Sequence, residues 1–316
     1  MAVHAHPDDE AIGTGGILAR YADEGVQTVL VTCTNGELGD APGGLKPGDP
    51  GHDEEVVVPL RRAELAASCE VLGVSHLELL GYHDSGMDGW PQNDAAGSFW
   101  RTPVDEPAAR LADLMRKYQP QVIVTYDENG FYGHPDHIQA NRITLAAIKA
   151  SDIPAKLYYT ALPRSALKGF RELLEETGIE GPQEVEENPD FGTPDELVTT
   201  RIDVSAVTGR KYASLAAHAS QSDNIFFLEM GEEVFSRIMN AEFFVRVLDK
   251  TNAPVPEDDL FADSAERSRA GPAPDREQGR RPGPGIPSDA PSLQLQRRRG
   301  PWWGLRGIEP PGLCGR

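Results

Sequence analysis

The chain has 316 residues and carries a formal net charge of −20, so it is long enough to bury a large core and acidic enough to repel phosphate backbones and anionic membrane surfaces. No run approaches the ~18 apolar residues of a membrane span, and no export signal stands at the start. We therefore expect a cytoplasmic protein with a small-molecule partner, without nucleic acid and without a membrane span.

Strands and amphipathic helices alternate in the first half of the chain. The expected strands cover residues 3–5, 26–33, 75–80 and 122–126. The expected helices cover residues 14–24, 59–72 and 135–149. This alternation predicts an α/β fold with a Rossmann-like, mostly parallel sheet flanked by helices in a single domain. Met1 falls inside the first strand, so we expect the natural start to lie upstream.

Two long loops interrupt this pattern. The first, over residues 35–55, is rich in Gly, Pro and Asp and is a candidate substrate lid. The second covers residues 81–103 and carries Trp90 and Trp100. Both offer polar and aromatic groups to a ligand.

The second half of the chain is less regular and then changes character. Expected strands cover residues 156–160, 198–204 and 241–248, and expected helices cover 206–219 and 232–240. Residues 264–316 contain nine Pro and nine Gly, a composition typical of disordered segments. The sequence therefore predicts one domain over residues 1–263 and a disordered Pro/Gly/Arg-rich tail over 264–316.

The first chemical motif, His6-Pro7-Asp8-Asp9, lies between the first strand and the first helix. Open α/β sheets place their ligands there. Zinc accepts His nitrogen and carboxylate oxygen, which makes His6 and Asp9 ligand candidates. Because consecutive side chains diverge, Asp8 is expected to point away from Asp9 and to act as a general base. The alternative is an Asp pair that caps the following helix.

The second motif, His134-Pro135-Asp136-His137, stands in the same relation to the strand at 122–126. His137 completes a three-ligand metal set with the first motif. Asp136 is expected to orient His134, since carboxylates commonly fix the tautomer of an imidazole beside a metal. Two such clusters after two strands predict a single zinc site with catalytic groups around it.

A nucleotide-binding interpretation of Gly13-Thr14-Gly15-Gly16 fails on spacing. The third glycine of G-x-G-x-x-G falls on Leu18, and Thr34-Asn35 stand where an acidic residue is needed at the end of the second strand. We expect the glycines to allow close approach of helix and sheet instead.

In combination, the two motifs resemble the PIG-L / LmbE-like family of zinc-dependent deacetylases, a family that includes deacetylase and conjugate-amidase enzymes of the mycothiol pathway. The resemblance covers residues 1 to about 250. It implies one zinc ion per chain at His6, Asp9 and His137, and a general base at Asp8.

The resemblance also implies roles for residues around the metal. Tyr132 and His134 would stabilise the oxyanion or assist the leaving amine. Arg61 would contact substrate, Asp84 would bind sugar hydroxyls, and Glu37 is a weaker candidate for the same task. The implied reaction is removal of an N-acetyl or other N-acyl group from a glucosamine-type sugar conjugate.

Three alternative functions and one question of mechanism stay open on the sequence alone. A catalytically silent sugar- and metal-binding protein is one alternative, although Asp8 is not needed to hold a metal. Amide hydrolysis of a mycothiol-type conjugate and metal-dependent ester or phosphoester hydrolysis are others. Whether Asp8 returns its proton to the leaving amine or His134 supplies one is also undecided.

Overall fold

Seven strands form one sheet in the order β3-β2-β1-β4-β5-β7-β6. The computed structural model describes residues 1–177 and 191–263. The strands are β1 (Ala2–His4), β2 (Val29–Thr34), β3 (His76–Tyr82), β4 (Val122–Thr125), β5 (Lys156–Ala161), β6 (Thr200–Asp203) and β7 (Ala241–Asp249). The first five pair in parallel, whereas β7 runs antiparallel to both β5 and β6. The predicted mostly parallel, Rossmann-like α/β sheet is confirmed.

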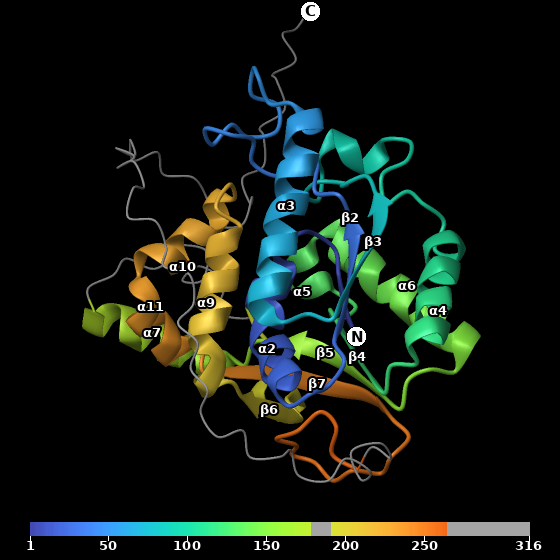
Figure 1. Cartoon of the computed structure of the whole chain (residues 1–316), viewed down its shortest axis with the longest axis vertical. Coiled ribbons are helices and arrows are strands. Elements are labelled where there is room, and N and C mark those ends of the chain that lie inside the picture. The colour runs from blue at the N-terminus through green and yellow to red at the C-terminus, as the bar shows by residue number, and fades with distance from the viewer. Residues whose placement is uncertain (178–190, 264–316) are drawn as a thin grey trace, which may run out of the picture.

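Helices cover both faces of the sheet (Figure 1). The α-helices are α1 (Asp9–Gly13), α2 (Gly15–Asp23), α3 (Glu54–Leu72), α4 (Asp105–Tyr118), α5 (Gly130–Gly133), α6 (Pro135–Ser151), α7 (Arg164–Thr177), α9 (Thr208–Ala217), α10 (Ile225–Glu229) and α11 (Gly231–Ile238). The short 3₁₀ turns are η1 (Pro91–Asp94), η2 (Asp195–Leu197), η3 (Ser205–Val207) and η4 (Ser222–Asn224).

Two apolar cores lie on opposite faces because successive strand residues point to opposite sides. Val3, Val31 and Ile123 pack with α4 and α6 on one face. Ala2 and Leu30, from the same strands, pack with α2 and α3 on the other. Burial on both faces explains why these strands are continuous apolar runs.

Helix α3 begins five residues earlier than the sequence pattern predicts. Asp53 accepts a hydrogen bond from the Glu55 amide as its N-cap, and Gly73 ends the helix in the left-handed conformation. Pro59 therefore lies inside the helix rather than at its start. The stabilisation from the N-cap outweighs the cost of a proline inside the helix. The first long loop is therefore shorter than predicted.

Helices α4 and α7 were not expected from the sequence. In α4, Ala108, Leu111 and Met115 are buried at helical spacing. The apolar signal was therefore present, but the preceding Gly- and Asp-rich loop obscured its start. The predicted tail over 264–316 lies outside the described residues.

Glu242 occupies the N-terminus of α2, at the glycines that the nucleotide-binding interpretation concerned. Its carboxylate accepts hydrogen bonds from the backbone amides of Gly16 (2.7 Å) and Ile17 (2.8 Å) at the start of α2, and it is paired with the buried Lys211. A Cβ on Gly16 would lie 2.7 Å from Val204. The helix N-terminus is thus already neutralised, and the glycine allows the close approach expected there.

Residues 251–263 are part of the folded domain. Glu257 is buried and accepts hydrogen bonds from Lys156 (2.8 Å) and Tyr158 (2.9 Å) of β5 and from Arg246 (2.8 Å) of β7. This segment therefore packs against β5 and β7 of the sheet.

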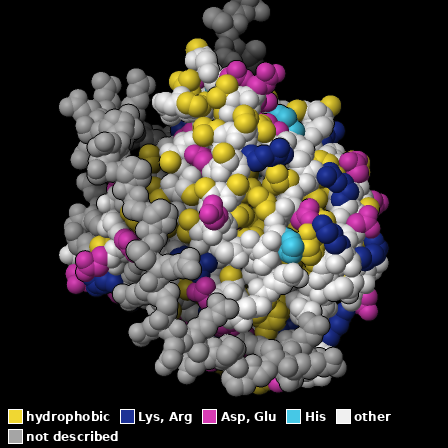
Figure 2. Space-filling model, in the orientation of Figure 1, with side chains coloured by type: hydrophobic (Ala, Val, Ile, Leu, Met, Phe, Trp, Pro, Cys, Tyr) yellow, Lys and Arg dark blue, Asp and Glu magenta, His cyan; other side chains and the backbone are white. Residues whose placement is uncertain are grey.

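The described surface mixes charges of both signs. On the face drawn in Figure 2, basic side chains over α4 stand beside acidic ones, as in the 2.7 Å ion pair of Arg116 with Asp113. Within the described ranges, no helix has the length and apolarity that a membrane crossing requires.

Candidate active site

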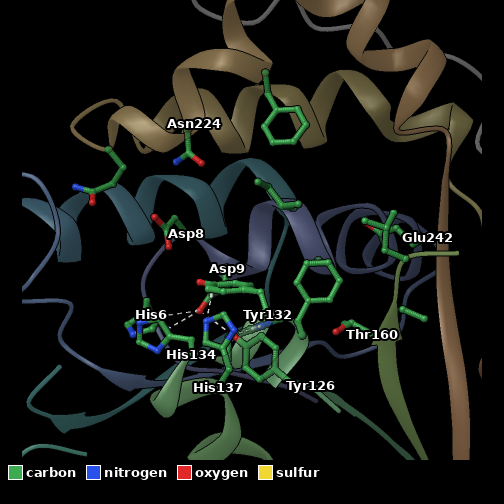
Figure 3. Close-up of a pocket in the computed structure, with 18 of the residues that line it drawn as sticks. His6, Asp8, Asp9, Tyr126, Tyr132, His134, His137, Thr160, Asn224 and Glu242 are labelled. Carbon is green, nitrogen blue, oxygen red and sulfur yellow. Dashed lines mark hydrogen bonds and ion pairs between the residues drawn. The ribbon is translucent and has the colours of Figure 1, made fainter. Parts of the chain in front are cut away.

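Both chemical motifs meet at the carboxyl ends of β1 and β4. These strands are neighbours in the sheet, and the strand order changes direction between them, which is where open α/β sheets bind ligands. His6, Asp8, Asp9, His134 and His137 line one cavity of about 370 Å³ (Figure 3). Residues 131 positions apart along the chain are thereby assembled into one site.

The three metal-ligand candidates lie against one another. Asp9 Oδ2 is 3.3 Å from His6 Nδ1, and Asp9 Oδ1 is 3.4 Å from His137 Nε2. A nitrogen of His134 lies within 4.8 Å of nitrogens of His6 and His137, so His134 is also within reach of an ion. The cluster offers imidazole nitrogens and carboxylate oxygens, the donors that a divalent metal ion accepts.

The hydrogen bonds of His137 leave one nitrogen free for a metal. Its Nδ1 lies 3.2 Å from the carbonyl oxygen of Gly130, which can only accept, so Nδ1 carries the proton. Nε2 is buried and has no hydrogen-bond partner in the described structure. A buried lone pair without a donor is the arrangement expected of a metal ligand.

Asp136 contacts His6 rather than His134. Its Oδ2 lies 3.3 Å from His6 Nε2 and accepts a 2.8 Å hydrogen bond from the Ser85 amide. A proton on Nε2 directed at this carboxylate leaves the Nδ1 lone pair of His6 facing Asp9. The expectation that this carboxylate orients His134 is not met, because residues two apart at a helix start do not share a side.

His134 is oriented by the backbone amide of Asp136 instead. His134 is the N-cap of α6, and its Nδ1 accepts that amide at 3.1 Å. Burial and the neighbouring imidazoles lower the pKa of His134 well below its ordinary value, so the ring is neutral. In a neutral ring whose Nδ1 accepts, the proton is on Nε2. His134 therefore presents a hydrogen-bond donor to the site.

Asp8 points away from Asp9, as expected. Its backbone is in the left-handed region (φ 119°), which is unfavourable for a residue with a side chain. Arg61 holds this conformation by donating to the Pro7 carbonyl (2.5 Å) and pairing with the Asp8 carboxylate (3.0 Å). Burial raises the pKa of Asp8 to about 6, against the opposing effect of Arg61. A carboxylate with that pKa suits a general base near neutral pH.

Tyr132 lies on the same wall as the second motif. Its ring centroid is 5.0 Å from that of His137 and 6.1 Å from that of His134. It follows Phe131, whose backbone is also in an unusual conformation (φ 66°, ψ −59°). The strained turn directs Tyr132 into the cavity (Figure 3).

Tyr126 is a residue of the candidate site that the sequence pattern did not reveal. Its hydroxyl donates to Asp9 Oδ2 at 2.7 Å and accepts from the Ala5 amide at 3.0 Å, while its ring stacks on His137 with centroids 4.0 Å apart. Tyr126 therefore orients two ligand candidates at once. Its place directly after β4, at the carboxyl edge of the sheet, was the available signal.

Some of the residues expected to contact substrate line the cavity, and others do not. Arg61, Asp84 and Trp90 line the cavity. Glu37 is not among the described lining residues and accepts hydrogen bonds from Asn35 and the Asp84 amide. Trp100 lies under the Arg142 guanidinium, 4.7 Å away. Of the candidate lid, Leu38 and Gly39 reach the cavity.

Comparison with known proteins identifies the family of the chain. The PIG-L family model, described as GlcNAc-PI de-N-acetylase, matches residues 1–148, which include both motifs. The chain is 43% identical over 279 residues to 1D-myo-inositol 2-acetamido-2-deoxy-alpha-D-glucopyranoside deacetylase of Acidothermus cellulolyticus, covering 83% of this chain and 94% of the relative. It is 42% identical over 294 residues to the deacetylase of that name from Salinispora arenicola, covering 86% and 94%.

Solved structures share the fold at lower identity. N,N'-diacetylchitobiose deacetylase from Pyrococcus horikoshii has a TM-score of 0.53 at 18% identity and covers 78% of this chain and 82% of that one. A 4-carboxy-2-hydroxymuconate hydratase from Pseudomonas putida has a TM-score of 0.54 at 21% identity and covers 80% and 97%. Since a hydratase shares it, the fold alone does not decide the reaction. The much closer sequence relatives do, and the chain belongs to the PIG-L family of de-N-acetylases, as an amide hydrolase.

Proposed function

We propose that this protein hydrolyses the N-acetyl group of 1D-myo-inositol 2-acetamido-2-deoxy-α-D-glucopyranoside, leaving acetate and the free amine, with one zinc ion per chain. The carrying observation is the juxtaposition of Asp8 with the His6, Asp9 and His137 cluster in one cavity. Relatives that cover most of the chain act, by name, on this glucosamine–inositol conjugate. The free, buried thiols of Cys33 and Cys69 suit a cytoplasmic enzyme.

The donor set supports zinc at this site. His6, Asp9 and His137 supply two imidazoles and one carboxylate, which resembles the three-ligand sets of catalytic zinc. The unpartnered Nε2 of His137 and the Tyr126 hydrogen bond to Asp9 favour this set. When bound, zinc polarises a carbonyl and makes water acidic near neutral pH.

Asp8 is the group that removes the proton from the attacking water. Its carboxylate diverges from Asp9, so it is free of the proposed ligand set, and Arg61 fixes its direction. The same burial that raises its pKa makes the carboxylate basic enough for this task.

In this proposal, His134 and Tyr132 stabilise the oxyanion that develops on the amide. The Nε2–H of His134 is a fixed donor because its Nδ1 is held by the Asp136 amide. A neutral His134 has no imidazolium proton to give. We therefore propose that Asp8, which receives the proton from water, passes it to the leaving amine, which is the first of the two alternatives that the sequence leaves open.

The experiment is acetate release by the purified, zinc-loaded protein from the inositol conjugate, with and without a chelator. We expect turnover that the chelator abolishes and that added zinc restores. A well-folded, zinc-replete sample that releases no acid from a panel of N-acylated glucosamine conjugates would favour the binding-protein alternative.

A further inference from the structure

Asn224 is a buried polar residue in the cavity wall that no part of the proposed reaction uses. It is 5% exposed, lies at the end of η4, and lines the cavity that contains Asp8 and the metal-ligand candidates. Its Nδ2 is buried and has no hydrogen-bond partner in the described part of the chain. An amide donor left unpaired in this way destabilises a folded protein.

The local fold does not need this side chain. Asn224 precedes α10, but its side chain makes no capping hydrogen bond. The neighbouring Gln221 provides a contrast, because its side chain accepts from the Asp40 amide at 3.1 Å and donates to Ser220 Oγ at 2.6 Å. Gln221 thus ties the lid loop to η4, whereas Asn224 contributes no such contact.

We propose that Asn224 is a specificity-determining residue that donates a hydrogen bond to an uncharged oxygen, a hydroxyl or an ether, on the group joined to the glucosamine. This inference rests on the proposed function and adds to it the residue that recognises the far part of the substrate. An amide that is unpaired in the folded protein and faces a binding cavity finds its partner in the ligand.

The position of Asn224 indicates which part of the substrate it meets. Figure 3 shows it on the far side of Asp8 from His6, His134 and His137. The scissile amide must lie between Asp8 and the metal-ligand cluster, so Asn224 faces the part of the substrate that extends away from the amide. In the proposed substrate that part is the inositol ring with its hydroxyl groups.

The charges of the cavity indicate an uncharged acceptor. Among the described residues that line it, Arg61 is already paired with Asp8 and Lys211 with Glu242. A phosphate or carboxylate on the distal part of the ligand would therefore find neither of these cations free to pair with it. A polyol needs only hydrogen-bond partners.

The test compares two substrates in wild-type and Asn224→Ala enzymes: the inositol conjugate and free N-acetylglucosamine, which lacks the distal ring. We expect Asn224→Ala to lower kcat/KM for the conjugate about 3- to 10-fold, mostly through KM, and to change kcat/KM for N-acetylglucosamine less than 2-fold. Asn224→Asp, which replaces the donor by an acceptor, should lose at least as much. Asn240→Ala, which removes an exposed amide bonded to the Arg237 carbonyl, is the matched control and should change neither substrate.

The melting temperature separates recognition from a structural role. Because Asn224→Ala removes an unpaired buried donor, we expect an equal or higher Tm than wild type. A lower Tm, or equal losses on both substrates, would overturn the assignment while leaving the proposed function intact. A wild-type enzyme inactive on both substrates would overturn the proposed function and this inference with it.

Discussion

The Nε2 of His218 lies 2.7 Å from Oε1 of Glu10, and both side chains are fully buried. Glu10 also accepts the Asp8 amide at 3.0 Å and the Ser68 hydroxyl at 2.5 Å. His218, which follows α9, is thereby connected through one carboxylate to the strained backbone of Asp8, the proposed general base. A residue from the second half of the chain thus helps to hold the backbone of the first motif through Glu10.

This pair should make stability depend on pH. Burial lowers the pKa of His218, but the charge and hydrogen bond of Glu10 together with the charge of Asp8 outweigh burial, so the pKa lies above the ordinary 6.5. Burial raises the pKa of Glu10, but His218 and the hydrogen bonds from Ser68 and the Asp8 amide together lower it below the ordinary 4.5. The charged pair therefore stabilises most between pH 4.5 and 6.5, and its stabilisation is lost as pH rises through the folded pKa of His218.

The measurement is the free energy of unfolding of wild type and of His218→Asn at a series of pH values from 5 to 9. Removing one partner of a buried ion pair costs about 3–5 kcal/mol. We expect a loss of that order below pH 6.5 and a smaller loss at high pH. A difference between the two proteins that stays constant from pH 5 to 9 would contradict the paired, charged state.

Replacement of Asp8 should separate catalysis from metal binding. Asp8→Asn keeps the size of the side chain but cannot take a proton, so we expect kcat to fall by about 10²–10⁴ with metal content unchanged. Asp113→Asn, at an exposed ion pair on α4, is the control and should match wild type. Unchanged turnover in Asp8→Asn would remove this residue from the mechanism.

Metal analysis of single variants should identify the ligand set. We expect His6→Ala, Asp9→Ala and His137→Ala each to lose metal on dialysis, while His134→Ala retains it and loses activity. The variant of His134 is informative because its ring is close enough to serve as a ligand. Metal loss in His134→Ala together with retention in Asp9→Ala would show that three histidines hold the ion.

Tyr126→Phe should weaken metal retention without unfolding the protein. The variant keeps the ring that stacks on His137 and removes only the hydroxyl that donates to Asp9. Loss of such a supporting hydrogen bond typically lowers metal affinity about 10- to 100-fold. Competition with a chromogenic chelator measures this directly, and equal affinities would show that the hydroxyl has no part in holding Asp9.

Two truncations should give opposite results. Deletion after Asp263 removes a segment with too few apolar residues to offset the entropy of ordering it, so we expect Tm and activity close to wild type. Deletion after Lys250 also removes Glu257 and leaves the buried Lys156 without its partner. We expect that protein to lose several degrees of Tm or to aggregate. A large fall in Tm for the shorter deletion would show that the tail is docked.

Much of the sheet and the two motifs could be predicted from sequence, because they depend on local patterns. Apolar runs such as residues 122–125 identify strands buried on both faces, and the motifs after two parallel strands must meet at one edge of the sheet. The early start of α3 and the helix α4 were missed, because a cap and a loop boundary depend on side-chain contacts that periodicity does not record.

The tertiary structure alone decided which partners each polar group takes. The sequence could not show that Asp136 contacts His6, that Glu242 closes the start of α2, or that Tyr126 holds Asp9, since these contacts join residues about 120 to 230 positions apart. Nor could it distinguish Asn224 from the many other polar residues of the chain. Residue types and their spacing set the available chemistry, but hydrogen bonds form between atoms that only the packed fold brings within hydrogen-bonding distance of one another.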